Sequence, residues 1–215
     1  MPYHYEATSE FMQSVSEVEK LVALASSDDE NRTLFLKLAA VSLVTKFQVF
    51  VENALDEFRY KLNGMTSGRL SLYMKMNAIH LSMTDDNVLT GIQKHHNFTE
   101  EKKNKIVDYL NSISFISDDD AKINESFKFT TKYPIGKTGK NNLKGLLSQI
   151  DGDQNPFEGF NKDDFNKLDS VLQTRHLIVH QDRFTGTETT VEDSITFIKK
   201  LVEYIDEYLS SKVPV

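Results

Sequence analysis

Apolar residues recur at helical spacing along almost the whole of this 215-residue chain. An early stripe between Phe11 and Ala25 falls at i, i+4, i+7, i+11 and i+14, which is one face of an α-helix. A late stripe between Val191 and Leu209 is equally regular. Helices with one apolar face bury it against one another. The sequence therefore predicts an all-α fold, a helical bundle.

The longest predicted helix runs from about residue 31 to residue 62, after a possible cap at Asp28 or Asp29 and before a stop at Asn63-Gly64. It carries apolar residues on two sides, which favours either a central helix or one that also meets a partner. The residues of the first side are Leu36, Leu43, Phe47, Phe50, Ala54 and Phe58. Those of the second side are Leu34, Leu38 and Val41.

The remaining segments are shorter, and we treat residues 1–215 as a single domain with additional helices around a bundle. Further helices are expected over 70–83, from Thr84 or Asp85 to 94, from Thr99 onward, over 142–150, and from Asn161 to about 181. The least regular part is 118–141, where proline and glycine favour loop and FKFTT is a candidate strand.

Composition excludes several classes of protein. The formal net charge of -7 argues against coating nucleic acid through bulk charge, although it leaves room for a small basic groove. The absence of cysteine removes disulfides, thiolate nucleophiles and cysteine-type zinc sites. The start, MPYHYEATSEFMQ, has no signal-peptide pattern, and no uninterrupted apolar run is long enough to span a membrane. A soluble, cytoplasmic protein is expected.

The segment TRHLIVHQD, residues 174–182, places an arginine and two histidines in one apolar helical stretch. His176 and His180 are four residues apart, so they stack on one side of a helix, and Arg175 can reach the same space. The planar guanidinium suits a phosphodiester, while histidine can take a proton from a sugar hydroxyl or return one to a leaving oxygen. These groups suffice to cleave RNA without a metal.

Two other interpretations of this segment stay open. Arg175 is able to form an ion pair between helices, for example with Glu52, and so serve only stability. His176 and His180 have the i, i+4 spacing of helical zinc ligands. The stretch between them lacks the glutamate that a zinc protease needs, and no third ligand is evident in the sequence.

The segment RHLIVH also resembles the R-x4-H signature of the HEPN (higher eukaryotes and prokaryotes nucleotide-binding) superfamily, with a polar residue directly after the arginine. Upstream, LFLKLAAVSLVTKFQVFVENALDEF is similar to the long helix of bacterial HEPN proteins and contains Glu52. The resemblance covers roughly residues 31–209. It departs after the final histidine, where a small residue is common and Gln181-Asp182 stands here.

The resemblance implies a single HEPN-like domain, residues 1–215, and a metal-independent endoribonuclease that needs no cofactor. Arg175 would hold the phosphate, His180 would act in proton transfer, His176 would support the site, and Glu52 would orient Arg175 or a histidine. HEPN domains usually dimerise, which implies a homodimer with a composite site. The setting implied is toxin–antitoxin or antiviral phage defence, with a possible antitoxin or regulatory partner. The alternative is a non-catalytic HEPN module for dimerisation or for binding nucleotide or RNA.

A local basic cluster stands out against the acidic total. Lys132, Lys137 and Lys140 lie in the irregular stretch, with Phe129 and Tyr133 beside them. Charge and aromatic stacking together are typical of single-stranded RNA binding. We therefore expect these lysines to contact RNA, while a solvated charged loop remains the other interpretation.

Overall fold

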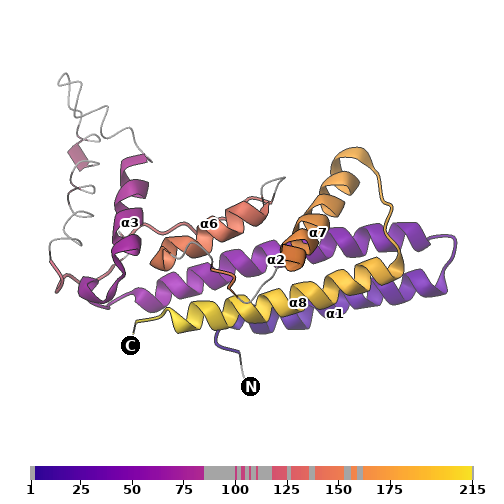
Figure 1. The fold of residues 1–215 in the computed structure, drawn as a ribbon, viewed down its shortest axis with the longest axis horizontal. Coiled ribbons are helices and arrows are strands. Elements are labelled where there is room, and N and C mark those ends of the chain that lie inside the picture. Colours follow the sequence, from indigo (N-terminus) through magenta and orange to yellow (C-terminus); the bar gives the residue numbers. More distant parts are fainter. Residues whose placement is uncertain are drawn as a thin grey trace. The chain divides into compact units, whose positions relative to one another are not determined.

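The computed structural model describes residues 3–84, 100, 103, 104, 107, 110, 118–124, 127–135, 139–152, 156–158 and 162–214. Over these residues the chain is all-α, as predicted, and contains no named strand. The helices, labelled as in Figure 1, are α1 (Glu6–Ser27), α2 (Arg32–Leu62), the 3-10 helix η1 (Ser67–Arg69), α3 (Leu72–Thr84), α6 (Gly139–Asp151), α7 (Lys162–Gln181) and α8 (Glu188–Ser211). The helices expected between Thr84 and Ile113 lie outside the described residues, apart from five isolated positions.

The chain divides into two compact units. The first comprises residues 1–57, 131–146 and 155–211, and the second comprises residues 58–130, 147–154 and 212–215. Helices α2 and α6 each contribute residues to both units. The residues of the RHLIVH segment belong to the first unit.

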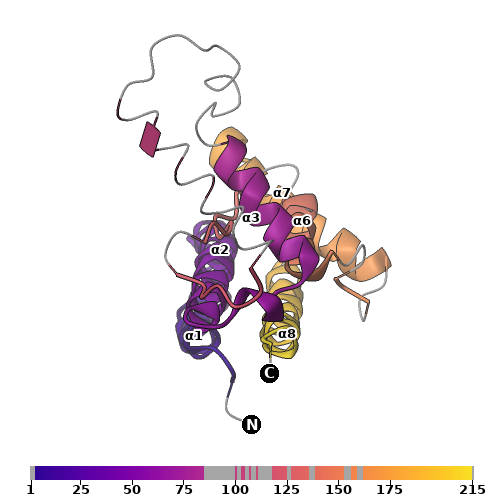
Figure 2. The same ribbon diagram turned by 90° about the vertical axis from the view of Figure 1, so that its left-hand side faces the viewer.

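The core of the first unit forms where α1 and α8 pack together. Figure 1 shows these two helices alongside each other with opposite chain directions, and Figure 2 views them nearly end-on. Both predicted stripes are buried, from Phe11 to Ala25 in α1 and from Val191 to Leu209 in α8. The first side predicted for the long helix is buried too, which confirms α2 as a core helix.

Carboxylates from other helices cap the beginning of α1. The buried Asp206 of α8 accepts hydrogen bonds from the Tyr5 backbone N–H at 3.1 Å and from the Thr8 hydroxyl at 2.6 Å. Glu57 of α2 accepts from the backbone N–H groups of Glu6 and Ala7. Because helix N-termini leave unpaired N–H groups and attract negative charge, these contacts fix the start of α1.

Helix α2 is also the one described helix that is long and apolar enough to cross a membrane by length and composition, with a mean hydropathy of 1.7. Its apolar side chains Leu43, Phe47, Phe50 and Ala54 are fully buried in the first unit. A core helix of a soluble protein meets the same criterion, so this composition is compatible with a soluble protein.

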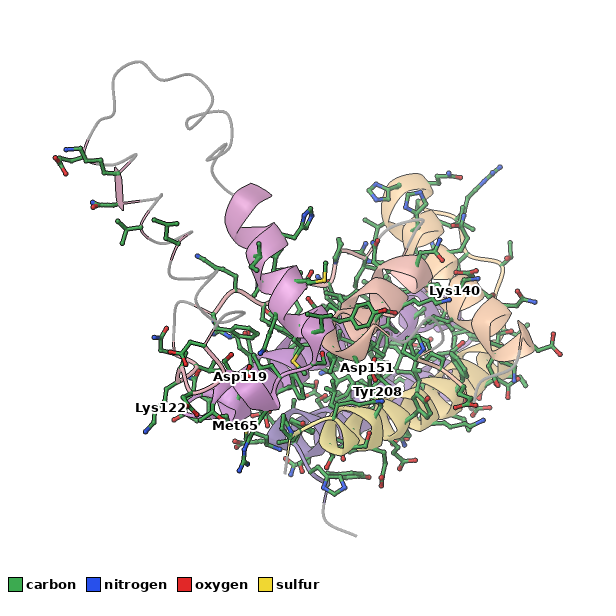
Figure 3. The ribbon with its side chains drawn as sticks, turned by 60° about the vertical axis from the view of Figure 1, so that its left-hand side comes forward. Met65, Asp119, Lys122, Lys140, Asp151 and Tyr208 are labelled. Carbon is green, nitrogen blue, oxygen red and sulfur yellow. The ribbon has the colours of Figure 1, made fainter. Side chains whose placement is uncertain are left out.

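The second unit contains a short backbone pairing in place of a sheet. Gly64 donates to the Ile123 carbonyl and Ile123 to the Met65 carbonyl, each at 2.9 Å, and Thr66 and Lys122 form an isolated antiparallel bridge. Met65 and Lys122 accordingly lie close together in Figure 3. Gly64, with φ of 80°, ends α2 as the sequence predicts.

The FKFTT segment, residues 127–131, is not a strand. The Gln149 side-chain amide donates to the Thr130 carbonyl at 2.8 Å, and its oxygen accepts from the Thr130 N–H at 3.4 Å. These bonds occupy the backbone groups that a neighbouring strand would use. Phe129 packs on Phe58 and Phe127, so the segment supplies core side chains of the second unit.

Helix α6 begins at Gly139, three residues before the predicted start at residue 142. A Cβ atom at Gly139 would lie 2.6 Å from Leu172 Cδ1 and 3.4 Å from the Tyr133 hydroxyl. A larger residue at this position would therefore force the Leu172 side chain of α7 to shift, and sequence periodicity does not reveal such a contact. Gly152, with φ of 73°, closes the helix.

Candidate functional site

Arg175, His176 and His180 lie in the last two turns of α7. Upstream, Leu168, Val171 and Leu172 are buried and anchor the helix to the first unit. From residue 174 onward the side chains become half-buried and then exposed, with Val179 and His180 exposed. The helix thus holds its polar end at the surface while its apolar part is fixed in the core.

The two histidines lie against each other, as the i, i+4 spacing predicts. Their ring centroids are 4.6 Å apart, with an angle of 49° between the ring planes. His176 is half-buried and has further contacts within the protein, whereas His180 is exposed. Among the described residues, no third histidine or carboxylate joins them to form a group able to hold a metal.

Arg175 has an unusual environment for an arginine. Its Nε atom is buried and has no hydrogen-bond partner within the described structure. Buried donors are nearly always satisfied in folded proteins, because an unpaired donor loses its hydration without compensation. Within the described structure, Nε of Arg175 is therefore a buried donor without an acceptor.

Glu52 forms its hydrogen bonds with Gln48 of α2 and with Lys132 and Tyr133, which precede α6. Its carboxylate accepts hydrogen bonds from the Tyr133 backbone N–H at 3.1 Å, the Gln48 amide at 3.2 Å and the Lys132 ammonium at 3.0 Å. In the described structure it forms no hydrogen bond or ion pair with Arg175. The hydrogen bonds of Glu52 therefore do not support its expected role in orienting Arg175 or a histidine. They also do not support the alternative, an ion pair between Glu52 and Arg175.

The contacts of Glu52 fix the segment that precedes α6. Burial acts to raise the pKa of Glu52, but the hydrogen bonds from Lys132, Tyr133 and Gln48 outweigh it and lower that pKa. The Gln48 amide also donates to the Tyr133 carbonyl at 3.0 Å. The Tyr133 ring then packs edge-on against Phe47, with centroids 6.0 Å apart. Burial raises the pKa of the Tyr133 hydroxyl, which has no hydrogen-bond partner in the described structure.

The predicted RNA-binding lysines are partly neutralised. The exposed Lys132 pairs with Glu52, and Lys140 Nζ lies 2.6 Å from Asp169 Oδ2 of α7. Figure 3 shows Lys140 near the beginning of α6. Lys137 lies outside the described residues. Pairing of this kind depends on the fold, so a sequence-level count of lysines overstates the positive charge here.

A residue that the sequence did not single out contacts the end of α7. Lys37 of α2 donates to the Asp182 carbonyl at 3.2 Å and lies 2.6 Å from Asp182 Oδ1. Asp182 directly follows the helix and adopts a left-handed conformation, with φ of 51°. The only sequence signal is the polar Gln181-Asp182 pair after the final histidine, and it does not reveal the partner.

Three exposed apolar side chains lie close in sequence to the Lys37–Asp182 contact. Leu34 and Leu38 of α2 lie on either side of Lys37 in the sequence, and Val179 lies three residues before its partner Asp182. All three are exposed. A separate hollow of about 290 Å³ lies between α1 and α2, over Phe11 and Phe50, and includes none of the three polar residues of the RHLIVH segment.

Comparison with protein families identifies the class of protein. A family model described as RiboL-PSP-HEPN matches residues 9–211, which covers nearly the whole chain. The protein is therefore a member of the HEPN superfamily, and it belongs to the RiboL-PSP-HEPN family. This membership supports a nucleotide- or RNA-related module. No curated protein and no solved structure matches the chain.

Proposed function

We propose that the chain is a metal-independent endoribonuclease with its site at Arg175, His176 and His180. The observation that carries this proposal is the buried, unpaired Nε of Arg175 beside a histidine pair whose rings are 4.6 Å apart. Arg175 is only half-buried as a residue, so its Nη groups rather than the buried Nε would meet a phosphodiester, whose oxygens suit the planar guanidinium.

The reaction is an internal transesterification of RNA. The 2′-hydroxyl oxygen attacks the adjacent phosphorus, the bond to the 5′-oxygen breaks, and a 2′,3′-cyclic phosphate and a 5′-hydroxyl result. Arg175 binds the phosphate oxygens and stabilises the charge that develops on them. His180 takes the proton from the 2′-hydroxyl or delivers one to the leaving 5′-oxygen. General acid–base catalysis of this kind typically raises the reaction rate by about 10²–10⁴-fold. His176 supports the position of the His180 ring.

The active form in this proposal is a homodimer. Leu34 and Leu38, which flank Lys37 on α2, and Val179, which precedes His180, are exposed, and burying exposed apolar surface favours association. A second copy that covers these residues brings two RHLIVH segments to one interface. The first contact with RNA then depends on Arg175 and on Lys132, Lys137 and Lys140, of which Lys132 and Lys140 must exchange a carboxylate for phosphate.

The biological setting we propose is toxin–antitoxin or phage defence, in the cytoplasm, with an antitoxin or regulator that restrains cleavage. Family membership is compatible with this setting. A nuclease that cleaves single-stranded RNA needs such restraint, because this RNA is abundant wherever the enzyme is made.

Incubation of the purified protein with single-stranded RNA and with DNA of matching sequence, in excess EDTA, tests the function. We expect cleavage of RNA alone and 2′,3′-cyclic phosphate ends, with both lost in the Arg175→Ala/His180→Ala variant. Equal cleavage by both proteins would identify a contaminant or another site. Binding of RNA without cleavage by a folded dimer would establish the alternative, a non-catalytic HEPN binding module.

A further inference from the structure

Helix α7 ends in a turn that an ordinary side chain disfavours. Asp182 is the one non-glycine residue with positive φ in the part of the chain that the structure describes. Left-handed backbone is unfavourable for most side chains and is most easily tolerated by glycine, asparagine and aspartate. Asp182 is thus suited to this conformation, and contacts around it add to the stability of the turn.

Two kinds of contact stabilise this turn. At the end of α7 itself, the Asp182 N–H donates to the Ile178 carbonyl at 3.1 Å and the Arg183 N–H donates to the Leu177 carbonyl at 3.2 Å. From outside the helix, Lys37 donates to both the carbonyl and the carboxylate of Asp182. Lys37 thereby joins α2 to the end of α7, and it places a cation where the helix carbonyls concentrate negative charge.

We propose that Lys37 is a positioning residue that fixes the last turn of α7 and, through it, the His180 ring. This inference rests on the proposed ribonuclease function. His180 lies two residues before Asp182 and is exposed, and its one described ring contact is with His176. No side chain of α7 after Leu172 is fully buried, and those from Val179 onward are exposed, so the final turn depends largely on its cap for a fixed position.

The location of Lys37 predicts an unequal effect on binding and catalysis. Arg175 lies next to the buried part of α7, so removal of Lys37 leaves phosphate binding nearly unchanged. His180 lies in the released turn, and small displacements of a catalytic group lower the rate of the chemical step. We therefore expect Lys37→Met to lower kcat by about tenfold to a hundredfold and to change KM by less than about twofold.

The chain offers a matched control on the same helix. Lys46 has the same exposed side-chain fraction as Lys37, 21%, and pairs with Glu17 of α1 at 2.7 Å instead of with α7. Lys46→Met removes a comparable ion pair and is expected to leave kcat unchanged. Lys37→Arg, which keeps the charge and the donors, is expected to restore most of the lost kcat.

The experiment combines steady-state RNA cleavage with NMR of isotope-labelled histidine rings, assigned through His180→Ala. Support for positioning is a shift of the His180 ring signals in Lys37→Met that is absent in Lys46→Met, together with the selective loss of kcat. The positioning role of Lys37 would be overturned if Lys37→Met and Lys46→Met changed kcat equally, or if the His180 ring signals did not shift in Lys37→Met. If the wild type cleaves no RNA, the proposed function fails, while the ring signals still decide whether Lys37 positions His180.

Discussion

At the scale of single residues, the unpaired Nε of Arg175 separates a binding role from a structural one. If Arg175 stabilised the bundle through an ion pair, its replacement would cost about 3–5 kcal/mol. The described structure contains no such pair, and removal of a buried unsatisfied donor can be neutral or stabilising. We expect Arg175→Met to change the free energy of unfolding by less than about 1 kcal/mol and to abolish RNA cleavage. Urea unfolding followed by circular dichroism measures the first quantity.

Glu52 gives a prediction about pH. Its folded-state pKa is lowered by Lys132, Tyr133 and Gln48, so its contacts stabilise the fold fully above the unfolded-state pKa of about 4.3. That contribution disappears as pH falls through the lowered folded-state pKa. We expect the stability difference between wild type and Glu52→Gln to be present at pH 7 and to shrink below about pH 4. A constant difference between pH 7 and pH 3 would contradict this account.

At the scale of helices, the sequence predicts what depends on periodicity and misses what depends on partners. The stripes of α1, α2 and α8 are buried as expected, because spacing alone determines which side of a helix is apolar. The pairing of Lys132 with Glu52, of Lys37 with Asp182, and of Thr130 with Gln149 joins residues at least nineteen positions apart. Nothing local to either partner encodes such contacts, so the sequence predicts that Arg175, His176 and His180 share one helix but not which side chains surround them.

Helix α6 offers a matched pair of glycines for testing the close approach of α7. A methyl group at Gly139 would meet Leu172 Cδ1 at 2.6 Å, whereas one at Gly145 would meet nothing within 4 Å. Overpacking typically costs about 1–3 kcal/mol, and alanine in an open helical position gains about 0.5–1 kcal/mol. We expect Gly139→Ala to lower the melting temperature and Gly145→Ala to raise it. Equal shifts in the two variants would mean that α7 does not constrain the start of α6.

At the scale of the whole molecule, the proposed ribonuclease requires two copies of the chain, and the exposed leucines of α2 allow this to be tested. Leu38, next to Lys37 on α2, and Leu24 on α1 each expose 47% of their surface, so a charge at either position leaves the fold of one chain intact. Only Leu38 lies on the face proposed for association.

We therefore expect Leu38→Glu to halve the mass measured by sedimentation and to reduce cleavage together with it. Leu24→Glu should remain a dimer with full activity, since a buried charge is costly only where a partner excludes water. A dimer that persists in Leu38→Glu would move the interface to another face of the molecule. Full cleavage by monomeric Leu38→Glu would instead show that one RHLIVH segment is sufficient for the chemistry.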